Sequence, residues 1–166
     1  KQRPKESAGY LLEGDVHAAG KNWDSAANAY RAGLKVAPAS ELVTRLHTAL
    51  SAGGKAADAE RAAADWMKAN PKDAVVPMFL GDRAIGANRL PDAQRHYERV
   101  IALQPNNAVA LNNLAWVAGQ LGRSDAIALA ERANQAAPNQ PAFMDTLAVL
   151  LSEKNEHARA LELQKR

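Results

Sequence analysis

The chain has 166 residues, of which 47% are apolar and only 5% aromatic, and it contains no cysteine. The missing cysteines exclude disulfides, thiolate metal sites and cysteine nucleophiles, and no apolar run approaches the about 20 residues that a membrane helix needs. The net charge of +3 comes with both signs scattered along the sequence. Because nucleic-acid binders cluster their basic residues on one face, we expect no nucleic-acid partner.

In chain order, the apolar periodicity predicts an all-α protein of ten helices paired into five hairpins. We call the first helix of each hairpin the A helix and the second the B helix. The A helices are expected at 7–19, 40–52, 74–87, 108–120 and 141–153, and the B helices at 23–36, 55–69, 90–103, 123–136 and 156–166. The corresponding repeats are 7–39, 40–73, 74–107, 108–140 and 141–166, the last truncated. Residues 1–6 are charged and terminal, so we expect them to be frayed or disordered.

The repeat is marked by prolines at the end of four hairpins, spaced 33 or 34 residues apart: Pro38, Pro71, Pro105 and Pro138. Within residues 74–107, the small residues Gly81 and Ala93 are expected where two helices approach most closely, and Leu80 and Tyr97 are expected to fill the space between layers. This pattern resembles the tetratricopeptide repeat, whose period is about 34 residues. The resemblance implies an α-solenoid that coils as a right-handed superhelix.

The second repeat departs from this pattern in its B helix. Ala63 stands where an aromatic residue is expected, and Trp66 stands where alanine is expected. The two positions are three residues apart and hence neighbours on one helix face. We therefore expect Trp66 in the core, with packing between repeats two and three that departs from the regular form.

A narrower resemblance covers the second half of the chain. The segments 103–116, 144–148 and 158–163 are similar to the C-terminal repeats of bacterial tetratricopeptide lipoproteins of the PEP-CTERM/exosortase protein-sorting system. That family is linked to exopolysaccharide production and is extracytoplasmic. The resemblance therefore implies a bacterial protein located in the periplasm or at the outer envelope, and a cytoplasmic location stays open.

In tetratricopeptide proteins the A helices line a concave groove that holds a protein or peptide. Asn113 is the first candidate, because the equivalent asparagine of peptide-binding members pairs with the ligand backbone; a merely solvated side chain is an equally weighted alternative. Trp116 and Phe79 are either binding anchors or packing residues. Acidic groove positions such as Asp15 and Asp82 hint at a basic or amide-rich ligand. The groove candidates are Arg45, Met78, Phe79, Asp82, Asn112, Asn113, Trp116, Gln120, Asp145 and Val149.

The sequence offers no catalytic constellation. The four histidines show no ligand spacing for zinc, so we expect them at polar helix positions, and Ser124-Asp125 reads as a helix N-cap. We therefore expect a non-catalytic scaffold without metal or cofactor. Two alternatives remain: end-to-end self-assembly through an exposed apolar end at Leu147, Leu151 and Leu161, or a regulatory arm of a larger polysaccharide synthesis or export protein.

Overall fold

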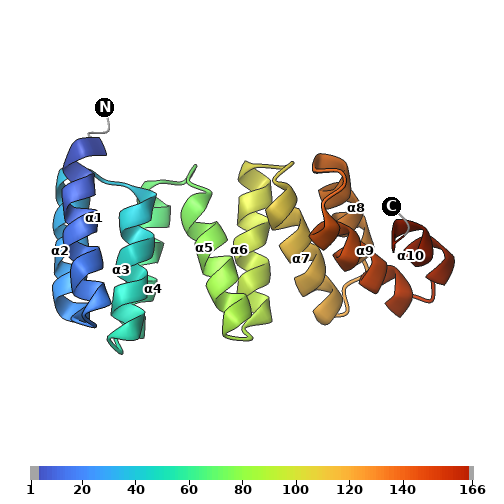
Figure 1. Ribbon diagram of the computed structural model, residues 1–166, viewed down its shortest axis with the longest axis horizontal. Helices are drawn as coiled ribbons and strands as arrows, with labels where there is room; N and C mark the ends of the chain where they lie inside the picture. Colours follow the sequence, from blue (N-terminus) through green and yellow to red (C-terminus); the bar gives the residue numbers. More distant parts are fainter. Residues whose placement is uncertain (1–3, 165–166) are drawn as a thin grey trace. The chain divides into compact units, whose positions relative to one another are not determined.

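The computed structural model describes residues 4–164, which form ten α-helices and no strand. Consecutive helices pair as antiparallel hairpins (Figure 1). The helices are α1 (Pro4–Ala19), α2 (Trp23–Val36), α3 (Ser40–Ala52), α4 (Ala56–Ala69), α5 (Val75–Gly86), α6 (Leu90–Leu103), α7 (Ala108–Gln120), α8 (Ala126–Ala136), α9 (Pro141–Glu153) and α10 (His157–Gln164). The five A helices are therefore α1, α3, α5, α7 and α9, as the periodicity predicts.

Two helix starts differ from the prediction by three residues. Helix α1 begins at Pro4, so residues 4–6, expected from the sequence to be frayed or disordered, are helical. The fixed φ of proline suits the first turn of a helix. Residues 1–3 lie outside the described part of the chain. Helix α8 begins at Ala126, three residues later than predicted. The intervening turn is held by the Asp125 carboxylate, which accepts hydrogen bonds from Arg123 Nε at 2.9 Å and Nη2 at 2.6 Å and makes no side-chain cap bond.

The repeated prolines act as helix terminators. The B helices of the first four repeats end at Val36, Ala69, Leu103 and Ala136, and in each case the proline stands two residues later. Proline lacks a backbone N–H and restricts the residue before it to extended conformations, so helices usually stop before such a dipeptide. The regular proline spacing thus fixes where each hairpin closes and the next begins.

The chain divides into two compact units, residues 1–76 and 77–166. Unit 1 holds the first two hairpins, with α1, α2 and α3 in mutual contact and α4 packed on α3. Unit 2 holds the later hairpins, in which α7 contacts α6, α8 and α9, and α10 packs on α9. The boundary between the two units falls at the start of the third repeat.

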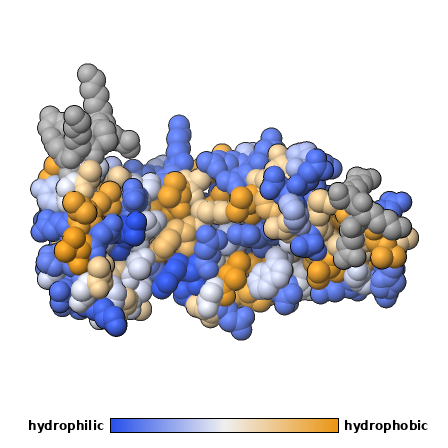
Figure 2. All heavy atoms as spheres, in the orientation of Figure 1, coloured by the Kyte–Doolittle hydropathy of each residue, from blue (hydrophilic) through white to orange (hydrophobic). Residues whose placement is uncertain are grey.

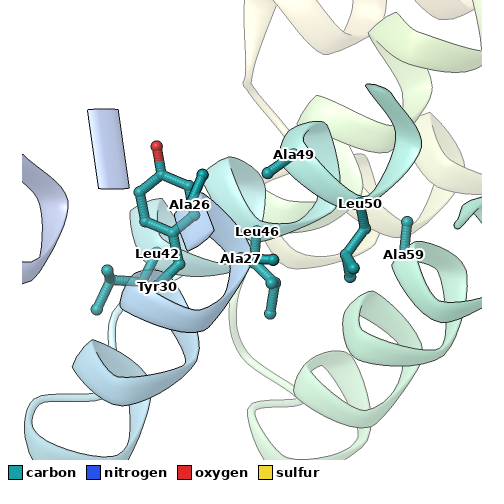
Figure 3. Close-up of a cluster of buried hydrophobic side chains, with 8 residues drawn as sticks. All are labelled: Ala26, Ala27, Tyr30, Leu42, Leu46, Ala49, Leu50 and Ala59. Atoms are coloured by element: carbon teal, nitrogen blue, oxygen red, sulfur yellow. The ribbon is translucent and has the colours of Figure 1, made fainter. Parts of the chain in front are cut away.

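The core of unit 1 is built from alternating large and small side chains. Leu42, Leu46 and Leu50 of α3 pack in one cluster with alanines of α2 and α4 and with Tyr30, which is 1% exposed (Figure 3). Gly33 lies close to Leu42: an added Cβ would stand 3.0 Å from Leu42 Cδ2. Small residues thus mark the points of closest helix approach, as their positions in the repeat predict.

Trp66 is not in the core, contrary to the prediction. Its side chain is only half-buried, whereas Val100 and Ala133, at the equivalent positions of later repeats, are both fully buried. An indole is too large for a position that elsewhere holds a methyl or isopropyl group. The ring is displaced to the end of α4, where its N–H donates to the Asp73 carboxylate, and Asp73 also accepts from Ser40 Oγ at 2.9 Å and from the Val75 backbone N–H at 2.7 Å.

The surface carries mixed chemistry. On the face seen in Figure 2, hydrophilic and hydrophobic residues lie side by side over each unit. No helix among the described residues is long and apolar enough to span a membrane. At the last hairpin, Leu147 and Leu151 are buried and only Leu161 is exposed, at 56%. The exposed apolar end expected there is thus reduced to one leucine, because α10 packs on α9.

Candidate functional site

The same tyrosine–aspartate pair joins the A and B helices of repeats one and three. In unit 1 the Tyr30 hydroxyl donates to Asp15 Oδ1 at 2.7 Å. In unit 2 the Tyr97 hydroxyl donates to Asp82 Oδ1 at 2.6 Å. The two residues of each pair are 15 positions apart, and each pair ties an A helix to the middle of its partner B helix.

A glycine before each aspartate makes room for the tyrosine ring. A Cβ added to Gly14 would lie 2.6 Å from Tyr30 Cδ1 and Cζ, and one added to Gly81 would lie 2.7 Å from Tyr97 Cε1. Carbon atoms in contact normally stand about 3.5–4.0 Å apart. Because the ring crosses the A-helix backbone at this point, its hydroxyl reaches the aspartate on the next residue.

A third polar side chain completes each cluster from the A helix of the following repeat. In unit 1 it is Arg45, whose Nη1 lies 3.8 Å from Asp15 Oδ1. In unit 2 it is Asn113, whose Nδ2 donates at 3.3 Å to both Asp82 Oδ1 and the Tyr97 hydroxyl. We call Asp15–Tyr30–Arg45 the unit 1 triad and Asp82–Tyr97–Asn113 the unit 2 triad. The two triads occupy equivalent repeat positions and differ only in the third residue.

The phenols of both triads are held in their neutral form. Burial raises the pKa of Tyr97, and the hydrogen bond to Asp82 raises it further, since it needs the phenolic proton. Burial and the hydrogen bond to Asp15 act in the same way on the pKa of Tyr30. At neutral pH each hydroxyl is therefore a fixed donor, and the negative charge of the triad resides on the aspartate.

Repeats two and four lack the triad because alanine stands at the tyrosine position of both. In repeat two, His47 stands at the glycine position and Ala63 at the tyrosine position. His47 is 3% exposed, and its Nε2 lies 3.7 Å from Glu60 Oε1. His47, one of the histidines expected at polar helix positions, is thus buried within its helix pair. In repeat four, Ala130 replaces the tyrosine and is fully buried.

The structure brings together several of the groove residues that the sequence predicts. Asn113 and Asp82 are hydrogen-bonded, and Trp116 lies one turn beyond Asn113 on α7 with 39% of its surface exposed. Phe79 is half-buried one turn before Asp82 on α5. Of the other candidates, Met78 is half-buried, and Arg45, Gln120, Asp145 and Val149 are exposed. Arg45 belongs to unit 1, whereas the other candidates belong to unit 2.

Of the groove candidates, Asn112 alone is buried. It is 9% exposed, and its Oδ1 has no hydrogen-bond partner among the described residues. Helix α7 packs against helices on several sides, so its buried arc extends past the apolar residues Leu111 and Ala115 and takes in this amide. A prediction from position within the A helix alone could not show how wide that arc is.

The two tyrosines are the site residues that sequence reasoning missed. The repeat pattern predicts only a space-filling role for Tyr97 and assigns none to Tyr30, whereas each hydroxyl organises a polar cluster. A signal was present: the dipeptide Gly-Asp followed by tyrosine 15 residues after the aspartate occurs in repeats one and three. Arg123 is a further such residue, since its guanidinium joins Asp125 to Glu98 Oε1 at 2.7 Å. These bonds raise the pKa of Arg123 and lower that of Asp125.

An additional surface feature of unit 1 lies beside Trp66. It is an open recess of about 510 Å³ lined by the two interrepeat turns, with Pro38 and Pro71 on its walls. The donors of Trp66 and Ser40 are directed to Asp73. No group of metal-ligating side chains is found within residues 4–164.

Comparison with known proteins supports the repeat. Residues 96–127 match the family model described as tetratricopeptide repeat. The fold is that of a tetratricopeptide-repeat solenoid. Among solved tetratricopeptide structures, MamA is 22% identical with a TM-score of 0.73, covering 98% of this chain and 90% of that one. PilF of Pseudomonas aeruginosa is 19% identical with a TM-score of 0.72, covering 96% and 74%. Yeast Tom70 is 18% identical with a TM-score of 0.77, covering 95% of this chain and 34% of Tom70. A search of curated proteins gave no match.

Proposed function

We propose that the chain is a non-catalytic scaffold that binds a protein or peptide on the exposed face of its A helices. The unit 2 triad carries this proposal. It presents a carboxylate and an amide at the surface, beside the indole of Trp116, which is 39% exposed. An exposed tryptophan next to fixed polar groups is typical of binding hot spots. The aromatic ring provides contact area with the ligand, and the polar groups fix the orientation of the ligand.

The fold supports the proposal because repeat hairpins place equivalent positions side by side. Asn113 on α7 reaches Asp82 on α5, 31 residues earlier, so side chains from successive A helices form one polar surface. A ligand lying across these helices would meet backbone-compatible donors and acceptors from more than one repeat. Rigid helices hold such groups more accurately than loops do.

For the biological setting we propose a bacterial extracytoplasmic role in protein sorting or exopolysaccharide production. The motivation is the resemblance of segments 103–116, 144–148 and 158–163 to lipoproteins of the PEP-CTERM/exosortase system. A periplasmic or outer-envelope location follows from the same resemblance.

Self-assembly is the second candidate function, and a different observation favours it. Leu12 and Val16 lie one turn apart on α1 and are 67% and 64% exposed. Val16 is equivalent to Val117 and Leu150, both buried in later A helices. An exposed face that is buried elsewhere in the array would suit a contact with another helix. Light scattering decides this point, since a monomer mass that does not change with concentration argues against assembly. A regulatory role beside a polysaccharide synthesis or export domain remains the third proposal.

The test of the leading proposal is a pull-down from a bacterial envelope extract with the native chain and the variant Asn113→Ala/Trp116→Ala. The matched control is Leu121→Ala/Gln135→Ala, which removes an apolar and an amide side chain that are also exposed. We expect a partner that the native chain and the control retain and that the folded site variant loses. Equal retention by all three proteins would contradict the proposed site.

A further inference from the structure

The unit 1 triad contains its own cation. Arg45 is the sixth residue of α3 and places its guanidinium 3.8 Å from Asp15 and 4.0 Å from Glu41. Asn113 is the sixth residue of α7 and stands at the equivalent place in unit 2. The chain therefore shows directly which group suits the space beside a tyrosine-bound aspartate: a guanidinium. In unit 2 the chain supplies an amide there instead.

The unit 2 triad is left with acceptors and a negative charge. A carboxylate can only accept hydrogen bonds, so the Asn113 amide must turn its NH₂ group toward Asp82 and its oxygen away. Asp82 Oδ1 already accepts from Tyr97 and Asn113. Asp82 Oδ2 and Asn113 Oδ1 have no hydrogen-bond partner within residues 4–164. A ligand that binds here must therefore bring donors.

Charge and aromatic neighbours point to a cationic donor. The three A helices of unit 2 carry Asp82, Asp145 and Glu153 against a single basic residue, Arg83. Arg83 follows Asp82 directly, so its side chain leaves the helix about 100° further round. Trp116, one turn from Asn113, is 39% exposed, and a planar guanidinium stacks on an indole ring better than an ammonium group does.

We infer that the unit 2 triad binds an arginine side chain of the partner, in the role that Arg45 plays within unit 1. The inference rests on the proposed binding function and adds the chemical class of the ligand: a basic peptide segment whose guanidinium meets Asp82 Oδ2 and Asn113 Oδ1. The unit 1 triad is closed to such a ligand because Arg45 already occupies it.

The test uses acetyl-Ala-Arg-Ala-amide as probe and the same tripeptide with citrulline, which keeps the shape but lacks the charge. Two-dimensional ¹H–¹⁵N NMR reports on the Asn113 side-chain amide and the Trp116 indole N–H. We expect the arginine peptide to shift both signals saturably and the citrulline peptide to bind about tenfold more weakly, the loss of a charge-assisted interaction. Equal binding of the two peptides would overturn the inference.

Reciprocal exchange of the third triad residue sharpens the test. Asn113→Arg should close the unit 2 site and abolish the shift at Trp116. Arg45→Asn should open unit 1 and give a second set of shifts, at the backbone amide of Asp15. Asp82→Asn keeps the shape of the cluster and removes its charge, so it should weaken the arginine peptide without affecting the citrulline peptide. Unchanged affinity in folded Asn113→Arg protein would refute the assignment.

A phage-displayed random peptide library separates this inference from the proposed function. Enrichment of arginine-containing peptides that need Asp82 supports both. Enrichment of neutral peptides that need Asn113 and Trp116 retains the binding function and overturns the arginine assignment. Failure to enrich any peptide that depends on these residues overturns both.

Discussion

The contact between Gly14 and the Tyr30 ring predicts opposite effects on stability for glycine-to-alanine substitution at two positions of α1. We expect the substitution to destabilise the chain at Gly14 and to stabilise it at Gly9. Gly14→Ala would set a Cβ 2.6 Å from two atoms of the Tyr30 ring. The ring cannot yield, because it is 1% exposed and its hydroxyl is bound to Asp15. Gly9→Ala, also within α1, would add a Cβ with nothing within 4 Å.

The magnitudes follow from two opposing effects. Overpacking a core costs about 1–3 kcal/mol, and we place this clash toward the upper end because the ring is pinned at both its face and its hydroxyl. Replacing glycine by alanine inside a helix stabilises the folded state by about 1 kcal/mol through helix propensity. We therefore expect Gly14→Ala to lower the free energy of unfolding by about 2 kcal/mol. Gly9→Ala, which only gains helix propensity, should raise it by about 0.5–1 kcal/mol.

Urea unfolding followed by far-ultraviolet circular dichroism measures both changes. Because repeat proteins can unfold in parts, hydrogen exchange of peptides covering α1 and α2 should accompany it and assign the effect to unit 1. The reasoning fails if Gly14→Ala is stabilising, or if it lies within about 0.5 kcal/mol of the native chain, the range of ordinary surface substitutions.

Three further outcomes follow from the polar contacts. Tyr97→Phe should lower the free energy of unfolding by about 1 kcal/mol, since it removes the hydrogen bond to Asp82 and keeps the ring. Urea unfolding measures the change, with Tyr97→Leu as the control for loss of ring volume. An unchanged free energy of unfolding in Tyr97→Phe would contradict the hydrogen bond. Because the pKa values of Tyr30 and Tyr97 are raised, their contribution to stability is complete below pH 10.0, the ordinary phenol pKa, and is lost as pH rises toward the folded-state values. Absorbance at 295 nm should show both phenols ionising only as the chain unfolds. Ionisation of either phenol in the folded chain near pH 10.0 would refute this prediction. The lowered pKa of Asp125 gives a contribution to folding stability that is present above pH 3.8 and is lost as pH falls below it. Arg123→Gln should abolish that part of the dependence of stability on acid pH. An unchanged acid unfolding curve would argue against the ion pair.

The fold class could be predicted from local pattern because each signal acts within one hairpin. A proline stops a helix wherever it stands, and the spacing of four prolines therefore sets the helix ends. The alternation of small and large residues fixes which faces meet, as Ala93 and Tyr97 illustrate: both are completely buried. These effects need only the sequence neighbours of each residue.

The sites could be predicted only in part, because their members come from different helices. Position in the A helix selected Asn112, Asn113 and Trp116 alike, although Trp116 is exposed, Asn113 is half-buried and Asn112 is buried. It also gave no means of pairing Asp82 with Tyr97. The displacement of Trp66 arises from the size of the pocket at its position, which depends on the neighbouring helices and not on its own sequence.

The sequence by itself determined the helices and their pairing into hairpins, since these follow from periodicity and helix-breaking residues. Only the tertiary structure decided that Arg45 satisfies Asp15 while Asn113 leaves Asp82 with open acceptors. That distinction depends on distances of 3–4 Å between atoms of residues about 30 positions apart, and such distances are set by how the hairpins pack.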